Sequence, residues 1–92
     1  MKTFAFLGDS VTEGCFALYP TSYGFDTVRE PGRAYPALLR PLLEERLGAV
    51  RLINAGRSGS NAHQALEGLD GVLAQEPDVA VVCFGLNDVF HP

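Results

Sequence analysis

Three short apolar segments in the sequence predict β-strands. Thr3–Leu7 is apolar and aromatic and is followed directly by Gly8, while Val50–Ile53 ends at the turn-forming Asn54. The third segment, Val79–Phe84, is apolar at every position and not only at alternate ones. Continuous apolar strands are typical of parallel sheets with helices on both sides. We therefore expect both faces of this third strand to be covered.

Two longer segments between these strands have the apolar spacing of helices. In Tyr35–Leu47 the leucines fall on one stripe, and Gly48 is a typical stop signal after the last turn. Pro36 suits the first turn of this helix. Pro41 is interior, so we expect it to bend or break the helix at that point.

The second helical segment, Ala62–Ala74, carries its own start and stop signals. Asn61 with Gln64 three residues later resembles a capping box, and Pro77 marks the exit. The order of predicted elements is then β-α-β-α-β, and right-handed crossovers make such a sheet parallel. We therefore predict an α/β fold of three layers, with a parallel sheet in strand order 2-1-3.

Residues 15–33 form a long segment without clear periodicity. The segment combines Pro, Gly, Ser and Thr with four aromatic residues: Phe16, Tyr19, Tyr23 and Phe25. Loops of this length are usually functional or disordered, and the aromatic residues favour a function. We expect this loop to border the substrate pocket.

Composition and charge narrow the class of protein. The 92 residues make at most one domain, 1–92, and 47% of them are hydrophobic, which is normal for a globular protein. A count of 7 Lys and Arg against 11 Asp and Glu gives a net charge of -4, which argues against nucleic-acid binding. No apolar run approaches the ~20 residues of a membrane span. Cys15 and Cys83 form neither a disulfide framework nor a metal site, which favours a reducing, cytoplasmic location.

Small and polar residues follow each predicted strand. The three segments are Gly8–Gly14, Asn54–Asn61 and Phe84–Asp88. In an open parallel sheet, ligands bind beyond the carboxyl ends of the strands, so all three segments should meet at one edge. Neither the Gly-Lys-Ser/Thr loop nor the Gly-x-Gly-x-x-Gly pattern of nucleotide sites occurs in the sequence, and no metal motif does, so we expect no cofactor.

The polar segments carry residue types that suit acyl transfer. Ser10 lies where a strand gives way to a helical turn, and the amide groups of such a turn favour the negative charge that forms when a hydroxyl attacks an acyl carbonyl. Gly59 could present a backbone N–H with no side chain in the way, and Asn87 could offer an amide N–H as a further donor. Asp9 is better suited to capping the turn than to acid catalysis.

Three stretches resemble, in order and spacing, the first three sequence blocks of the SGNH (GDSL-type) hydrolases: Gly8-Asp9-Ser10, Asn54-Ala55-Gly56-Arg57-Ser58-Gly59 and Gly85-Leu86-Asn87-Asp88. The resemblance implies a flavodoxin-like three-layer α/β/α fold and hydrolysis of esters, often of acylated sugars or lipids. It makes Ser10 the nucleophile. It also implies an oxyanion hole formed by the N–H groups of Ser10 and Gly59 and by the side chain of Asn87.

The sequence departs from this family in the last block, an Asp-x-x-His that supplies the general base and its orienting carboxylate. Asp88 and His91 fit that spacing, but Asp88 already belongs to the third block beside Asn87. We therefore expect the base and its carboxylate to lie outside this chain. The chain is then expected to be the N-terminal part of a larger domain, or one partner of a homodimer joined through Val79–Phe84, since an apolar edge strand invites pairing.

Other interpretations of the same residues stay open. Gly56-Arg57-Ser58-Gly59-Ser60 nearly matches the Gly-x-Ser-x-Gly elbow, which would make Ser58 the nucleophile, although Ser60 replaces the final glycine. We interpret His63 as a surface histidine and Glu13 as a solvated charge. The alternative function is a non-catalytic α/β binding module, or an inactive truncated hydrolase, that keeps the pocket without the base. A phosphoacceptor receiver domain fits less well, because it needs paired acidic residues after the first strand.

Overall fold

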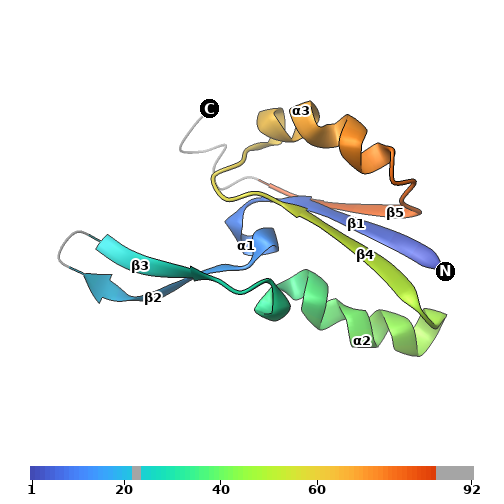
Figure 1. Cartoon of the computed structure of the whole chain (residues 1–92), viewed down its shortest axis with the longest axis horizontal. Coiled ribbons are helices and arrows are strands. Elements are labelled where there is room, and N and C mark those ends of the chain that lie inside the picture. Colours follow the sequence, from blue (N-terminus) through green and yellow to red (C-terminus); the bar gives the residue numbers. More distant parts are fainter. Residues whose placement is uncertain (22–23, 85–92) are drawn as a thin grey trace.

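The computed structural model of the protein describes residues 1–21 and 24–84, whose arrangement is shown in Figure 1. Along the chain the elements are β1 (Lys2–Gly8), α1 (Ser10–Glu13), β2 (Cys15–Thr21), β3 (Gly24–Arg29), the 3-10 helix η1 (Pro31–Arg33), α2 (Tyr35–Leu47), β4 (Val50–Gly56), α3 (Ala62–Leu73) and β5 (Val79–Cys83). The three predicted strands and both predicted helices are present, with small differences at their ends.

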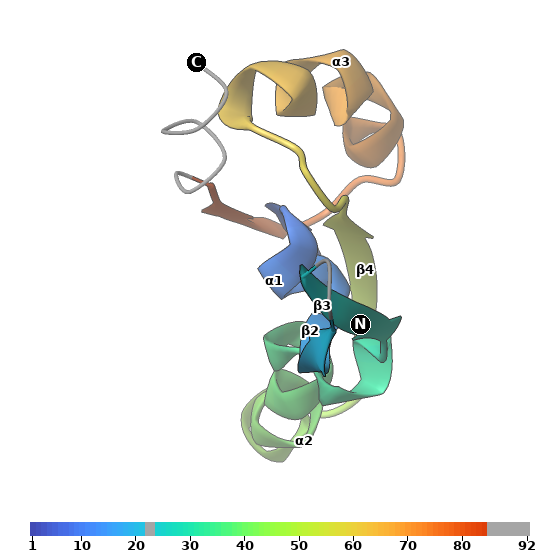
Figure 2. The same ribbon diagram turned by 90° about the vertical axis from the view of Figure 1, so that its left-hand side faces the viewer.

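Three parallel strands form the sheet at the centre of the molecule, in the order β4-β1-β5. β1 pairs with β4 along its whole length, and with β5 from Phe4↔Val79 to Gly8↔Cys83. Helices α2 and α3 lie on opposite faces of this sheet, as two perpendicular views show (Figures 1 and 2). The predicted three-layer α/β fold with strand order 2-1-3 is therefore confirmed.

The central strand β1 carries most of the core. Phe6 is fully buried on the side of α2, where its ring contacts Tyr35 edge-on with 5.8 Å between the ring centroids. Ala5 and Leu7 pack with Val72 of α3 on the other side. Successive side chains of a strand point to opposite faces, so β1 meets both helical layers and is covered on both faces.

Strand β5 is more exposed than its sequence predicts. We expected both of its faces to be covered, but Val79 is 43% exposed and Val82 is 66% exposed. β5 lies at the edge of the sheet, and its residues are exposed or only half-buried among the described residues. The apolar pattern correctly indicates a strand of a parallel sheet, but it does not indicate which elements cover that strand. Pairing of Val79–Phe84 with a second copy stays a prediction.

Residues 15–33, predicted as a loop, contain an antiparallel hairpin and a short 3-10 helix. β2 pairs with β3, and the register shifts between Ala17 and Tyr19. The hairpin projects away from the three-stranded sheet (Figure 1), and a strand outside the main sheet need not alternate apolar and polar residues. The period-two pattern that identifies a strand is therefore missing from this segment, and the prediction of a loop is wrong.

The helices begin and end at the predicted signals. The Asn61 side chain accepts from the Gln64 N–H at 2.9 Å, and the Gln64 side chain accepts from the Asn61 N–H at 3.0 Å, so the capping box of α3 is confirmed. Gly48 ends α2, and its N–H donates to the Glu44 carbonyl at 2.9 Å. Within the described ranges, no helix is long and apolar enough to cross a membrane.

Helix α2 continues through Pro41, where we expected a bend or break. It is one helix from Tyr35 to Leu47, and Pro41 lies inside it, exposed to solvent. A proline inside a helix removes one main-chain hydrogen bond, and its ring crowds the preceding turn. Contacts of α2 with β4 and with η1 hold the segment in place in spite of this cost. The predicted break is therefore wrong.

Two glycines allow the turn α1 to lie directly against the ends of two strands. A Cβ at Gly56 would lie 2.5 Å from the Glu13 nitrogen and 2.9 Å from the Glu13 Cα, which are main-chain atoms. A Cβ at Gly8 would overlap the Thr12 side chain. The turn therefore packs its main chain against Gly56 and the Thr12 side chain against Gly8, and only glycine fits at these two strand ends.

We predict that Gly56→Ala destabilises the protein by about 1–3 kcal/mol, because the added methyl group overpacks this contact. Gly68→Ala is the control, and it should instead raise the free energy of unfolding. No atom of the described residues lies within 4 Å of a Cβ built at Gly68, and alanine is more favourable than glycine inside a helix by about 0.5–1 kcal/mol. Chemical denaturation of both variants measures the change in the free energy of unfolding. A Gly56→Ala variant as stable as the wild type would contradict the close packing of α1.

Candidate active site

Strands β1, β4 and β5 end at the same level of the sheet. Gly8 pairs with Gly56 on one side and with Cys83 on the other. Just beyond these residues, the Arg57 N–H donates to the Gly8 carbonyl at 3.0 Å. The segments that follow β1 and β4 therefore start side by side at this edge. The third predicted site residue, Asn87, follows β5 in the sequence and lies outside the described residues.

Ser10 is the first residue of the turn α1. Asp9 caps this turn as predicted, since its carboxylate accepts from the Val11 N–H at 3.0 Å. The Glu13 N–H closes the turn by donating to the Asp9 carbonyl at 3.0 Å. The Ser10 side chain is half-buried, and within residues 1–21 and 24–84 neither its hydroxyl nor its N–H has a hydrogen-bond partner. Both groups remain available at the edge of the sheet.

Gly59 occupies the third position of a tight turn after β4. The Ser60 N–H donates to the Arg57 carbonyl at 3.1 Å, which closes the turn. Gly59 has a φ of 78°, a left-handed value that the third residue of a type II turn requires and that glycine adopts without strain. A Cβ added here would meet no atom within 4 Å in residues 1–21 and 24–84. The backbone angle, and not crowding, therefore favours glycine at this position.

Most main-chain N–H groups around Ser10 and Gly59 already have acceptors. The N–H groups of Arg57, Ser58 and Ser60 are all bound to acceptors within the protein. The Gly59 N–H has no acceptor in the part of the chain that the structure describes, and the same is true of the Ser10 N–H. Main-chain N–H groups without an acceptor are suited to binding a negatively charged oxygen. Among the described residues, the two predicted donors therefore have no acceptor, while the neighbouring N–H groups do.

The prediction for Glu13 is wrong, because this side chain is not a solvated charge. It is only 17% exposed. One carboxylate oxygen accepts from the Arg29 Nε at 2.8 Å, and the other accepts from the Ser58 N–H at 2.7 Å. The Ser58 N–H, and after it the Arg29 guanidinium, lower the pKa of Glu13 from its ordinary value of 4.5. Glu13 thus links the turn α1 to the hairpin and to the turn that contains Gly59.

Ser58, the rival nucleophile, is part of a different local structure from the one that its sequence suggests. Its hydroxyl lies 2.9 Å from the Cys15 thiol. It lies in the middle of the turn between β4 and α3, whereas the serine of the Gly-x-Ser-x-Gly elbow lies where a strand passes directly into a helix. The segment therefore does not have the geometry of that elbow. His63 is exposed on α3, as predicted.

A polar network supports the turn α1 from the sheet. The Asn54 side chain donates to the Thr12 carbonyl and accepts from the Gly56 N–H, both at 2.9 Å. Thr12 is fully buried, and its hydroxyl lies 3.0 Å from the Tyr35 hydroxyl at the start of α2. Sequence reasoning missed these supporting roles because the partners are far apart in the chain. Of these residues, only Asn54 could have been identified from the sequence, because it is the first residue of the second sequence block.

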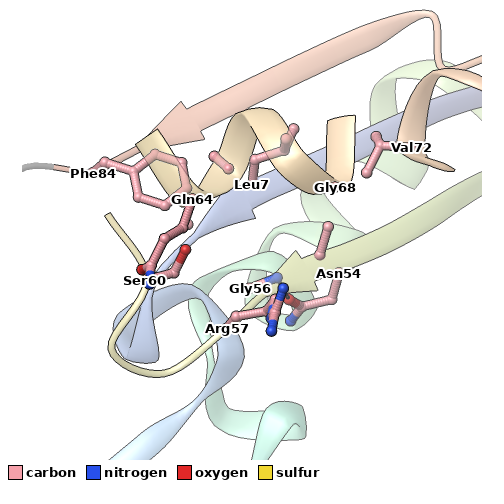
Figure 3. Close-up of a pocket in the computed structure, with 12 residues that line it drawn as sticks. Leu7, Asn54, Gly56, Arg57, Ser60, Gln64, Gly68, Val72 and Phe84 are labelled. Atoms are coloured by element: carbon pink, nitrogen blue, oxygen red, sulfur yellow. Dashed lines mark hydrogen bonds between the residues drawn. The ribbon is translucent and has the colours of Figure 1, made fainter. Parts of the chain in front are cut away.

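A pocket of about 250 Å³ lies between α3 and the carboxyl ends of β1 and β4 (Figure 3). Its lining is partly polar and partly apolar, and includes Asn54, Arg57, Ser60, Gln64, Leu7, Val72 and Phe84. Gly59 borders a smaller hollow of about 110 Å³, and Ser10 lines neither space. The larger pocket therefore adjoins the Gly59 turn and not the Ser10 hydroxyl. Among the described residues, no three His, Cys, Asp or Glu side chains are placed to hold a metal ion.

Comparison with solved structures defines the class of protein. A lipase/acylhydrolase from Enterococcus faecalis matches with 30% identity and a TM-score of 0.73, over 96% of this chain and 40% of that one. AlinE4, an SGNH-hydrolase family esterase, matches with 30% identity and a TM-score of 0.69, over 97% of this chain and 42% of that one. A catalytic mutant of Axe2, an acetylxylan esterase from Geobacillus stearothermophilus, matches with 31% identity and a TM-score of 0.71, over 97% of this chain and 41% of that one. The chain is therefore similar in fold to the corresponding part of these hydrolases.

A family model gives the family itself. The model of the GDSL-like Lipase/Acylhydrolase family matches residues 6–92. The chain therefore belongs to the GDSL-like lipase/acylhydrolase family, and the resemblance found in its three sequence blocks is confirmed. No curated protein matches the chain. The chain spans about two fifths of the length of the three solved structures.

We predict that Glu13 stabilises the protein at neutral pH and that this contribution is lost in acid. Because folding lowers the pKa of Glu13, the contribution is fully present above its ordinary value of 4.5 and disappears as the pH falls through the lower, folded-state pKa. The free energy of unfolding of the wild type and of Glu13→Gln is compared at a series of pH values. The difference should be constant at neutral pH and should shrink below 4.5.

Glu44→Gln is the matched control for the loss of a carboxylate from an ion pair. The pair of Glu44 with Arg40 is exposed on α2, with 3.4 Å between nitrogen and oxygen. Exposed pairs of this kind contribute little to stability, so this variant should stay close to the wild type. A Glu13→Gln effect that does not change with pH would contradict the assigned contacts of Glu13.

Proposed function

We propose that the protein hydrolyses carboxylic esters, with Ser10 as the nucleophile. The observation that carries this proposal is the pair of unoccupied N–H groups of Ser10 and Gly59. They belong to segments that leave neighbouring strands at the paired residues Gly8 and Gly56. An oxyanion needs such donors at about 3 Å. The family of the chain and the esterases among its structural neighbours support the proposal.

In the proposed reaction, the Ser10 hydroxyl attacks the acyl carbon of the ester and passes its proton to a general base. The carbonyl oxygen becomes an oxyanion, which accepts from the N–H groups of Ser10 and Gly59 and from the Asn87 side chain. When the intermediate collapses, the base returns the proton to the departing alcohol and the acyl group stays on Ser10. Water then releases the acid by the same sequence of steps. We assign the base and its orienting carboxylate to a histidine and an aspartate outside this chain.

The substrate class that we propose is an acylated sugar or a lipid-like ester. Two of the structural neighbours support these classes by name, one as a lipase/acylhydrolase and one as an acetylxylan esterase. The pocket next to the Gly59 turn has an apolar part at Leu7 and Phe84 and a polar part at Arg57. Such a lining suits a substrate with an apolar and a polar end.

A non-catalytic α/β binding module is the second candidate, and one observation favours it. No described residue forms a hydrogen bond with the Ser10 hydroxyl, so no general base contacts the nucleophile within the described ranges. A serine without a base is a weak nucleophile. Covalent labelling of Ser10 therefore separates the two candidates.

We predict that a fluorophosphonate probe labels the intact protein at Ser10. The probe reacts with activated serines, so Ser10→Ala should lose the label. Ser58→Ala removes the rival nucleophile and should keep the label. Peptide mass spectrometry identifies the modified residue. Labelling at Ser58 would favour the rival nucleophile, and a folded protein without any label would favour the binding module.

We predict that Asn87→Ala lowers kcat by about 10²–10³, because removing one oxyanion donor costs about that much. KM should change far less, since the donor acts mainly on the transition state. Gln75→Ala is the control, because it removes an amide side chain beyond the end of α3, where Gln75 accepts from Arg51 at 2.9 Å. Steady-state hydrolysis of para-nitrophenyl acetate gives both constants. A kcat unchanged by Asn87→Ala would exclude this side chain from the oxyanion hole.

A further inference from the structure

Glu13 connects the segment of the proposed nucleophile with the segment of the proposed oxyanion donor. It belongs to the same helical turn as Ser10, and its N–H is bound to the Asp9 carbonyl at 3.0 Å. Its carboxylate accepts from the Ser58 N–H at 2.7 Å, and Ser58 directly precedes Gly59. This single bond joins residues 45 positions apart in the sequence. It therefore ties the two halves of the candidate site together.

The hydrogen bond to Glu13 is donated by the main-chain N–H of Ser58 and not by its side chain. Ser58 and Gly59 are the two middle residues of the turn that the Ser60 N–H closes on the Arg57 carbonyl. A tight turn that is held at one of its middle N–H groups cannot rotate as a unit without breaking that bond. The direction of the Gly59 N–H therefore depends on where Glu13 holds Ser58.

Arg29 orients the Glu13 carboxylate. Its Nε donates to one oxygen at 2.8 Å, which leaves the other oxygen for Ser58. It also balances the charge of a side chain that is mostly shielded from water. The other ion pairs of the described residues, Arg33–Glu30 and Arg40–Glu44, join residues three or four positions apart on the surface. The pair of Glu13 and Arg29 thus differs from them by reaching the site.

We propose that Glu13 is a positioning residue of the active site: by accepting the Ser58 N–H, it sets the Gly59 N–H relative to Ser10. This role rests on the proposed function, since it concerns the oxyanion hole of an esterase. Glu13 touches no reacting atom and acts through the turn. A purely structural role would change the free energy of unfolding and leave kcat of the folded protein unchanged.

Variants of Glu13 test the role in the intact protein, with para-nitrophenyl acetate as the substrate. Glu13→Ala removes the acceptor and should lower kcat by about 10- to 100-fold with little change in KM, because a displaced donor stabilises the oxyanion poorly. Glu13→Gln keeps a carbonyl oxygen that can accept the Ser58 N–H, so it should recover most of the activity. Glu44→Ala, which removes an exposed carboxylate from α2, is the control and should keep the wild-type kcat. A folded Glu13→Ala variant with the wild-type kcat would overturn the proposal.

A second test removes the donor, the Ser58 N–H, and keeps the acceptor, the Glu13 carboxylate. Ser58→Pro has no N–H, and proline suits the second position of a type II turn, so the turn can form without the bond. Ser58→Ala is the reference for this variant, because both lose the hydroxyl that lies 2.9 Å from the Cys15 thiol and only Ser58→Pro loses the N–H. If Glu13 acts through this N–H, Ser58→Pro should lower kcat as Glu13→Ala does. The double variant should then be no slower than either single variant, since both changes remove the same interaction. Losses that multiply in the double variant would overturn the proposal.

Amide hydrogen exchange separates the role of Glu13 from the proposed function. The Ser58 amide should be protected in the wild type and in Glu44→Ala, and it should exchange at least about tenfold faster in Glu13→Ala. An unprotected Ser58 amide in the wild type would overturn the role of Glu13 even in an active esterase. A protected Ser58 amide in a protein that neither hydrolyses esters nor reacts with the fluorophosphonate would overturn the proposed function, and the positioning role with it.

Discussion

The approach of the turn α1 to the ends of β1 and β4 is the contact on which the rest of the site depends. Because Gly56 has no side chain, the main chain of α1 lies directly on the end of β4, and because Gly8 has none, the Thr12 side chain fits against the end of β1. The Asn54 side chain can then reach the Thr12 carbonyl, and the Thr12 hydroxyl reaches α2. The turn is thereby attached to the sheet and to one helical layer at once. These contacts therefore fix the position of Ser10, which is the first residue of the turn.

Hydrogen bonding explains how the segment between β4 and α3 keeps its shape without regular structure. The N–H groups of Arg57, Ser58 and Ser60 donate to a carbonyl of β1, to the Glu13 carboxylate and to a carbonyl of the turn itself, respectively. Gly59 is the exception in this segment, because no described residue accepts from its N–H. A donor that is fixed in advance stabilises charge without reorganising during the reaction. A rigid turn with one unoccupied donor therefore suits the proposed chemistry.

The sequence predicted the features that depend on neighbours in the chain and missed those that depend on distant ones. The capping box of Asn61 and Gln64 joins residues three apart, and the strand order follows from the connections between apolar segments. The hairpin was missed because its sequence lacks the alternating apolar pattern by which a strand is recognised. The role of Glu13 was missed because its partner Ser58 is 45 residues away, and a charged residue in a turn has no pattern that reveals such a partner. The three sequence blocks predicted the candidate site residues, but not the contacts that hold them.

The proposed site has two parts, the oxyanion donors and the general base, and different contacts position each of them. The segments of Ser10 and Gly59 are held by the pairing of β1 with β4 and by the hydrogen bond that the Ser58 N–H donates to Glu13. Neither contact involves a histidine. In the proposed site, the two N–H donors thus depend on two neighbouring strands, whereas the proposed base is not among the residues that contact the Ser10 hydroxyl within the described ranges. In serine hydrolases, removing the base leaves the residual catalysis of the oxyanion hole and of binding, so the two parts act separately. If the proposed site is correct, binding of a negatively charged oxygen therefore depends on the pairing of β1 with β4, and covalent reactivity of Ser10 depends on the base.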